Sequence, residues 1–334
     1  MDIFTWIREN LAPEPRTTET LIYDHMASQS GRSLPIIYQP FDPEQPGHWR
    51  DRGAALDFAL ATEAEGRRVL DFGPGDGWPS LIIAPLVGEV VGLEGSQRRV
   101  EVCAANAARL GIENVRFERY EPGTPLPFPD GSFDAVVAAS SVEQSPDPRA
   151  TLAEFYRVLR PGGRARIYYE ALGAYRGGQE REAWLWDVDE TACRLVLYDR
   201  DIAGEQAVQV VLGIAMSGTA LLSALGVEGR GIDIADVTVA QLEALRPAIV
   251  DAGICTTHHP SGATLVRRLR EIGFREALPT HNGMEIAGDL YHQLPAAQRP
   301  STLEAIDAYL RPIVAATVEL RAPIADDPMI TATK

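Results

Sequence analysis

The sequence predicts an α/β protein built on a mostly parallel β-sheet, with an α+β segment inserted near the end of that sheet. Short apolar runs typical of buried strands alternate with helical patterns at the spacing of right-handed βαβ units. A glycine-rich turn joins the first of these strands to the helix that follows. The alternation breaks after Glu170 and resumes near Ser261, which predicts the insertion.

Composition limits the classes of partner and compartment. The chain has 334 residues and a net charge of −16, whereas nucleic acids and anionic membranes bind basic surfaces, so neither is an expected partner. No apolar run approaches the length of a membrane span, and charges interrupt the N-terminal apolar run, unlike a secretory signal. Three widely spaced cysteines suit a reducing compartment, so we expect a cytoplasmic protein. The only lysine, Lys334, excludes lysine Schiff-base chemistry in the folded interior.

The N-terminal region, residues 1–50, is predicted as a helical strap. Residues 2–11 have the pattern of a short amphipathic helix, and a loop rich in proline, glycine and aromatic residues runs from Gly31 to Trp49. This region could cover one end of the sheet, or it could be a lid over a ligand pocket. A helix over residues 51–63 then leads into the first strand.

The first part of the main domain is predicted over residues 51–174. Pro79 favours the first turn of a short helix, Ser96 can cap the next helix and Gly111 can end it. The first predicted strand contains the apolar pair Val69–Leu70, and the next are 89–94, 115–119, 133–139 and 165–169. The predicted helices between them are 81–83, 97–110 and 147–159.

The insertion is predicted over residues 175–254, and the main domain resumes over 255–334. Residues 171–189, at the start of the insertion, show no regular pattern. Strands of the insertion are predicted at 193–198 and 206–214, and helices at 218–225 and 238–252. The hairpin 193–214 could form a homodimer interface, since an exposed strand edge invites pairing. Later elements are helices 262–272, 284–294 and 301–319, a strand at 274–279, and a final main-sheet strand within 327–334.

The glycine spacing in the glycine-rich turn distinguishes between two possible classes of ligand, a dinucleotide and a positively charged molecule. A dinucleotide fingerprint has its third glycine three positions after the second, but here the glycines are Gly73, Gly75 and Gly77. Asp71 stands two residues before the first glycine, where a carboxylate repels a phosphate and attracts a cationic or amine-bearing ligand. The turn therefore favours a ligand with a positive charge.

The run Val69–Gly77 resembles the first motif of class I S-adenosylmethionine-dependent methyltransferases. Glu94 at the end of the second strand, the run 126–134 and the turn 159–163 are similar to three further motifs of that family, in the same order. The resemblance covers residues 51–170 well, and it is closest to the small-molecule group that includes quinone-biosynthesis methyltransferases. It implies a Rossmann-like, seven-stranded, mostly parallel sheet with helices on both faces, and S-adenosylmethionine as the cofactor with S-adenosylhomocysteine as its product.

The resemblance also implies a cofactor site. The glycine turn would surround the methionine part of the cofactor, and Glu94 would bind both ribose hydroxyls, although Glu94 could also be a solvated strand end. The family's adenine-binding Asp is absent, and Glu121 is the candidate in its place, with altered spacing. The implied cofactor residues are Asp71, Gly73, Gly75, Gly77, Glu94, Gly95, Glu121 and Ser140.

Catalytic and acceptor residues are less defined. Where many relatives have a Glu-His pair after the fourth strand, this chain has Glu143 and Gln144, so that histidine is absent. No catalytic residue is assigned; the candidates are His25, His258 and Tyr23. The candidates for the acceptor pocket are Tyr23, Trp49, Gln144, Tyr169 and Trp184, and each aromatic residue among them could equally be a packing residue. No metal site is expected, because the adjacent His258 and His259 point apart on a strand.

The sequence therefore predicts an enzyme that transfers a methyl group to a small, aromatic or apolar acceptor by in-line displacement. Two alternatives belong to other classes. The absent histidine and the insertion would also suit a binding or regulatory protein that retains the fold without catalysis. An NAD(P)-dependent oxidoreductase would require a glycine spacing that the chain lacks.

Overall fold

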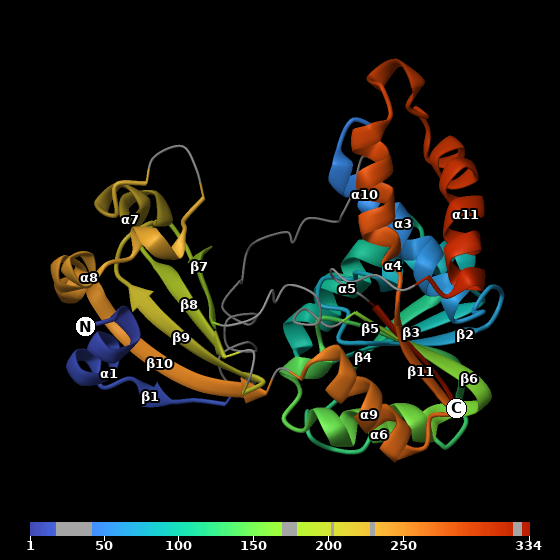
Figure 1. The fold of residues 1–334 in the computed structure, drawn as a ribbon, viewed down its shortest axis with the longest axis horizontal. Helices are drawn as coiled ribbons and strands as arrows, with labels where there is room; N and C mark the ends of the chain where they lie inside the picture. The colour runs from blue at the N-terminus through green and yellow to red at the C-terminus, as the bar shows by residue number, and fades with distance from the viewer. Residues whose placement is uncertain (18–41, 169–178, 202–203, 228–230, 259, 323–328) are drawn as a thin grey trace. The chain divides into compact units, whose positions relative to one another are not determined.

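The computed structural model describes residues 1–17, 42–168, 179–201, 204–227, 231–258, 260–322 and 329–334 (Figure 1). The chain divides into two compact units. One combines Gly31–Ala174 with Pro260–Lys334, and we call it the main unit. The other combines Met1–Ser30 with Tyr175–His259, and we call it the second unit.

The main unit is built on a seven-stranded sheet with the order β11-β12-β6-β5-β2-β3-β4. The pairs from β6 to β4 are parallel, whereas β12 is antiparallel to both β6 and β11. This arrangement confirms the predicted seven-stranded, mostly parallel sheet, and it confirms the last residues as a strand of that sheet. The strands are β2 (Arg68–Phe72), β3 (Glu89–Glu94), β4 (Val115–Arg119), β5 (Phe133–Ala139), β6 (Leu159–Tyr168), β11 (Glu276–Thr280) and β12 (Met329–Thr333).

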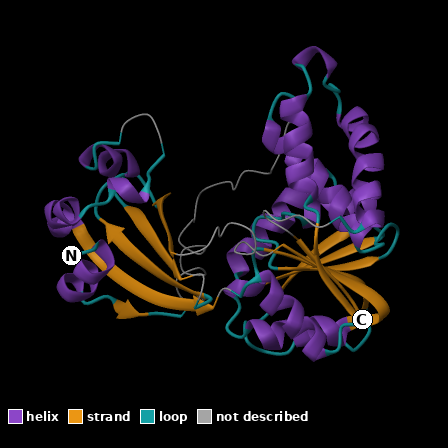
Figure 2. Cartoon of the chain, viewed as in Figure 1, coloured by secondary structure: helices purple, strands orange, loops and turns teal. Residues whose placement is uncertain are grey.

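Helices cover both faces of this sheet (Figures 1 and 2). Helices α3 and α4 lie on one face and α6 and α9 on the other, while α5 packs against β3 and β4. Ser96 caps α5 and Gly111 ends it in the left-handed conformation, as predicted. The helices are α3 (Pro46–Ala61), α4 (Ser80–Ile83), α5 (Gln97–Leu110), α6 (Pro148–Val158), α9 (Gly262–Ile272), α10 (Gly283–Gln293) and α11 (Leu303–Leu320).

Helix α3 is anchored to the pair α10 and α11, which lies between β11 and β12 in the sequence. A Cβ atom added to Gly53 would come within 2.1 Å of the Gly283 carbonyl oxygen, so the two backbones touch directly. Arg52 is buried and forms an ion pair of 2.5 Å with Asp307 of α11. Trp49 is fully buried and packs edge-to-face against Tyr291 of α10. These contacts fix the position of α3 within the main unit.

The second unit holds a five-stranded sheet with the order β1-β10-β9-β8-β7. Its core buries Phe4 and Ile7 of helix α1 (Ile3–Leu11) together with aliphatic residues of the sheet and of the helices α7 and α8. The elements are β1 (Glu14–Pro15), β7 (Gln179–Asp187), β8 (Cys193–Asp201), β9 (Gln206–Ile214), β10 (Ile249–His258), α7 (Gly218–Ala224) and α8 (Val239–Leu245).

The structure corrects several predicted elements. Helix α3 begins at Pro46, inside the predicted loop 31–49, and helix α4 begins at Ser80, after Pro79. Strand β6 begins at Leu159 and runs through the predicted turn 160–163. Residues 179–187 form a strand where no regular structure was predicted.

Three further corrections concern the second unit. The predicted helix 238–252 ends at Leu245, and residues 249–258 form β10, which pairs with β9 as far as His258, beyond the predicted end of the insertion. The hairpin 193–214 offers no free edge, because β7 pairs with β8 and β10 pairs with β9. The predicted strap is divided, since α1 belongs to the core of the second unit and α3 to the main unit.

Candidate functional site

The chain order of the main sheet reverses between β2 and β5. From β2 the chain moves outward to β3 and β4, and from β5 it moves the other way to β6, so β2 and β5 are the neighbours at the switch point. Open α/β sheets bind ligands beyond the carboxyl ends of the strands at this point. The segments that meet there are the glycine loop (residues 73–77), the turn after β3 and residues 140–145 after β5.

The glycine loop is held closely against the segment after β5. The Ser141 hydroxyl donates a 2.6 Å hydrogen bond to the Phe72 carbonyl oxygen. Gly73 has φ +73°, and a Cβ atom there would lie 2.5 Å from the Ser141 Cβ. Only glycine accommodates both the backbone conformation and this close contact. At Gly73 the loop therefore places backbone, rather than a side chain, against Ser141.

Helix α5 supports the same loop from a second side. The Cys103 thiol donates to the Gly75 carbonyl oxygen at 3.3 Å, and the Asn106 amide donates to the Asp76 carbonyl oxygen at 3.0 Å. Burial raises the pKa of Cys103, so the thiol stays protonated and remains a donor. These side chains satisfy buried carbonyls of the loop, which makes Cys103 a structural residue.

Glu94 connects β3 to the centre of the glycine loop. Its side chain is almost fully buried, and it accepts hydrogen bonds from the backbone N–H groups of Gly75 (3.0 Å) and Ser96 (3.1 Å). These hydrogen bonds lower the pKa of Glu94, but burial has the larger effect and raises it above its usual value. A carboxylate offers about four acceptor positions, so about two remain for a ligand.

Asp71 lies beneath the loop at the end of β2 and has no exposed surface. Its Oδ2 accepts a 2.5 Å hydrogen bond from the Ser80 hydroxyl, whereas its Oδ1 has no partner among the described residues. Burial raises the pKa of Asp71 to about 7, and the charge of Glu94 acts in the same direction. A buried carboxylate with an unsatisfied oxygen is costly unless a ligand supplies the missing partner.

Two further carboxylates near the loop were not predicted as site residues. Asp51 of α3 accepts a 2.8 Å hydrogen bond from the Trp78 indole N–H, and burial raises its pKa to about 7. Burial also raises the pKa of Asp76, while Arg99 lowers it. Asp51 stands 27 residues before Trp78 in the chain, and only its place on the helix before β2 could have pointed to it.

The remaining predicted cofactor residues occupy different positions. Gly77 closes the loop with φ +114°, and Gly95 follows Glu94, where its carbonyl oxygen accepts from Arg119. The Glu121 side chain is 73% exposed and lies 3.7 Å from Arg119. Ser140 has φ +47° and lies directly after β5 at the switch point. Of this group, Glu121 is the most solvent-exposed.

The predicted acceptor and catalytic residues are dispersed. Gln144 lies at the switch point, where its amide donates to the Ser140 carbonyl oxygen at 2.5 Å. Trp49 packs between helices, which gives it a structural role, and we leave it out of the site. Trp184 and His258 belong to strands of the second unit. The predictions for Tyr23, His25 and Tyr169 lie outside the described residues.

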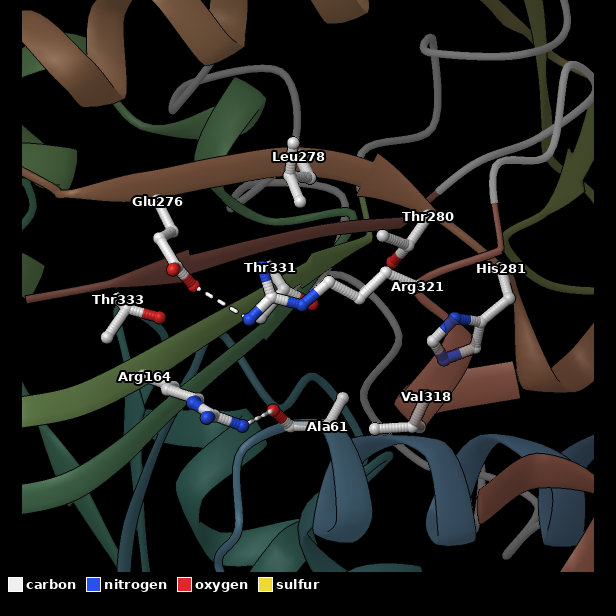
Figure 3. A pocket seen from close by; sticks show the side chains of 10 residues that line it. All are labelled: Ala61, Arg164, Glu276, Leu278, Thr280, His281, Val318, Arg321, Thr331 and Thr333. Carbon is white, nitrogen blue, oxygen red and sulfur yellow. Dashed lines mark hydrogen bonds and ion pairs between the residues drawn. The ribbon is translucent and has the colours of Figure 1, made fainter. Parts of the chain in front are cut away.

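Away from the switch point, a hollow of about 50 Å³ lies at the antiparallel end of the main sheet (Figure 3). Beside it, Arg166 and Asp57 form a fully buried ion pair with contacts of 2.7 and 2.9 Å. Arg166 also donates to the hydroxyls of Thr280 and Thr331, and the Gly283 N–H donates to Asp57. Every charge of this pair is compensated within the chain, in contrast to Asp71.

Comparison with known proteins agrees with the site at the switch point. Residues 70–167 match the family described as a methyltransferase domain. The demethylmenaquinone methyltransferase of Thermus thermophilus is 39% identical over 149 residues, which cover 39% of this chain and 65% of the relative. The 27-O-demethylrifamycin SV methyltransferase of Amycolatopsis mediterranei is 33% identical over 148 residues, which cover 41% and 54%. The chain thus spans less than two thirds of each of these relatives.

A solved structure shares the fold over almost the whole chain. The CcbJ methyltransferase from Streptomyces caelestis superposes with a TM-score of 0.50 at 16% identity, covering 95% of this chain and 96% of that one. The chain therefore carries a class I S-adenosylmethionine-dependent methyltransferase domain with a Rossmann-like sheet, and S-adenosylmethionine is the cofactor of this domain. In the described part of the chain, no helix is long and apolar enough to cross a membrane.

Proposed function

We propose that the protein transfers the methyl group of S-adenosylmethionine to a small-molecule acceptor. The observation that carries this proposal is the glycine loop with Glu94 bonded to its centre and Asp71 beneath it. A carboxylate at each position favours a ligand with hydroxyl donors and positive charge over one with phosphates. The matched methyltransferase domain has such a cofactor.

Each group has a proposed role in binding the cofactor. The two free acceptor positions of Glu94 suit a ribose diol, which presents two neighbouring O–H donors. The backbone of the glycine loop and Asp71 would hold the methionine part. Ser140, directly after β5, would border the same part, and Gly95 and Glu121 would lie near the adenine.

The bound cofactor supplies a methyl group on a sulfonium, which is already an activated leaving group. The chain then mainly needs to align the acceptor atom with that methyl group, and such alignment can contribute roughly 7–11 kcal/mol to lowering the barrier. Gln144 is the predicted acceptor-side residue placed at the switch point, and its amide is oriented by Ser140. We assign no general base.

The relatives support a small acceptor, since their names refer to a demethylmenaquinone and a demethylrifamycin. The second unit offers a groove of about 410 Å³ lined by Trp184, Leu185, Leu222 and Ile232. Its volume is that of a small-molecule pocket, and its lining combines these apolar side chains with the charged Arg181, Glu182 and Asp233. We propose that this unit contributes to recognition of the acceptor.

Isothermal titration calorimetry with S-adenosylhomocysteine tests the proposal. Saturable binding is expected, and Glu94→Ala should weaken it roughly 10- to 100-fold because hydrogen bonds to a charged acceptor are lost. Unchanged affinity in Glu94→Ala would refute the proposed ribose site. Binding of NADH in preference to S-adenosylhomocysteine would indicate an oxidoreductase instead.

Methyl transfer itself is tested with purified protein and a panel of phenolic, quinone-derived and amine acceptors. The expected result is S-adenosylhomocysteine formation that depends on the acceptor. Cofactor binding without turnover across the panel would favour the binding or regulatory alternative.

A further inference from the structure

Helix α3 presents one carboxylate to the glycine loop and directs its neighbouring cations elsewhere. Arg50 pairs with Glu285 of α10, and Arg52 pairs with Asp307 of α11. Asp51, between these arginines, instead meets Trp78, the residue that follows the loop. The side chains adjacent to Asp51 therefore engage other carboxylates.

The Trp78 indole fixes the orientation of Asp51. Its N–H donates to Oδ1 at 2.8 Å, and its ring packs edge-to-face on Phe58 with centroids 6.0 Å apart. No other hydrogen bond to Asp51 is found among the described residues, so Oδ2 keeps its acceptor positions. Asp51 is half-buried, which leaves this oxygen partly accessible.

Arginines compensate the carboxylates of the loop region only in part. Arg50 and Arg52 lower the pKa of Asp51, but burial outweighs them. Burial raises the pKa of each of the four carboxylates of this region, Asp51, Asp71, Asp76 and Glu94. Arg99 lowers the pKa of Asp76 and Glu94 but is not among the groups that act on Asp51 or Asp71. A ligand that carries two positive groups suits this distribution of charge.

We infer that the Asp51 carboxylate, oriented by Trp78, receives the ammonium group of the cofactor's methionine part. This inference rests on the proposed function and adds to it a specificity determinant outside the methyltransferase motifs. An ammonium has three N–H donors and needs acceptors, and Oδ2 of Asp51 is an available one beside the loop. Asp51 thereby distinguishes ligands with the amino group from those without it.

Calorimetry with three ligands on the full chain tests this inference. S-adenosylhomocysteine has the ammonium group, its deaminated analogue retains only the carboxylate, and 5′-methylthioadenosine lacks the amino-acid part altogether. Asp51→Asn keeps an acceptor for Trp78 and removes the charge, so it should weaken S-adenosylhomocysteine roughly 10- to 100-fold. Affinity for the other two ligands should change less than about threefold, a change that corresponds to under 1 kcal/mol.

Three further variants test this result. Glu94→Gln should weaken all three ligands, because all three carry the ribose. Asp130→Asn removes a carboxylate in the turn before β5, at the amino-terminal ends of the parallel strands, and should change the affinity for none of the three ligands. Trp78→Phe, which removes the orienting donor, should repeat the pattern of Asp51→Asn with a smaller loss.

The outcomes separate the inference from the proposed function. Equal losses for all three ligands in Asp51→Asn would mean that Asp51 supports the loop, and no loss for S-adenosylhomocysteine would place the ammonium elsewhere; either result overturns the inference. If Asp51→Asn does not fold, Trp78→Phe decides by the same criterion. Failure of the wild-type chain to bind any of the three would overturn the proposed function as well.

Discussion

Asp57 and Asp71 are both fully buried in the main unit, yet their surroundings differ completely. Asp57 contacts Arg166, His281 and the Gly283 N–H. Burial alone would raise its pKa, but Arg166 and His281 outweigh burial and the pKa lies below its usual range. The polar groups that act on Asp71 are the hydroxyl and the backbone N–H of Ser80, and burial raises its pKa to about 7.

The difference separates a charge that the chain itself compensates from one that we propose a ligand compensates. The chain supplies both partners of the Asp57–Arg166 pair, so that pair holds α3 against β6 whether or not a ligand is bound. At Asp71 the chain supplies polar groups of Ser80 but no cation, and one carboxylate oxygen has no hydrogen-bond partner among the described residues. Such incomplete compensation is typical of a site where the ligand completes the set.

Breaking the compensated pair should produce the largest effect. Arg166→Met leaves Asp57 buried without its guanidinium, and loss of one partner of a buried pair costs about 3–5 kcal/mol. Urea denaturation of the full chain should show this as a lower unfolding midpoint. Arg321→Met is the control, since its pair with Glu276 lines the same hollow but is half-exposed and should cost less than about 1 kcal/mol. Equal losses in both variants would contradict the distinction.

Neutralising the uncompensated carboxylate should raise the free energy of unfolding of the ligand-free protein instead of lowering it. Asp71→Asn retains an acceptor for Ser80 and removes the buried charge, so at pH 8 the ligand-free protein should gain up to about 4 kcal/mol. The same change should weaken S-adenosylhomocysteine binding. Denaturation with and without ligand measures both effects. A less stable Asp71→Asn with unchanged affinity would show that Asp71 is a structural residue.

The stability contributions of Asp71 and Asp57 should also depend on pH in opposite directions, which is a smaller effect. Because the pKa of Asp71 is about 7 when folded and about 3.9 when unfolded, the folded state binds the extra proton between these values, and stability from this group falls as pH rises from 4 to 7. The advantage of Asp71→Asn should therefore shrink from pH 8 to pH 5. For Asp57 the sign is reversed: its contribution is complete above about pH 4 and is lost as pH falls through the lowered folded pKa. An advantage of Asp71→Asn that is constant with pH would argue against the raised pKa.

The main sheet was predictable because most of its strands contain short apolar runs that turns and helix caps separate. Strand β7 was not, since Gln179–Asp187 is an edge strand that begins with the charged run 180–182, and its apolar run spans only residues 183–186. The apolar pattern at 246–252 fits a helix and a strand equally well. Its pairing with β9, more than thirty residues away, decides the outcome.

The candidate site was predictable where its residues lie close together in the sequence. Asp71, the glycine loop and Glu94 lie within one βαβ unit, and the family motif identifies them. Asp51 was missed because its importance depends on a contact between helix α3 and Trp78, which lies 27 positions further along the chain. The Asp57–Arg166 pair joins residues 109 positions apart, and no local pattern indicates it.

The contact between Gly53 and Gly283 has a consequence for how this protein could change over time. Asp51 is two residues from Gly53, so any side chain at position 53 or 283 would push α3 away from α10 and shift the carboxylate relative to Trp78. The touching atoms are main-chain atoms, and no substitution elsewhere can make them smaller. Positions 53 and 283 should therefore resist substitution in any descendant that keeps this helix pair, although neither residue carries a functional group.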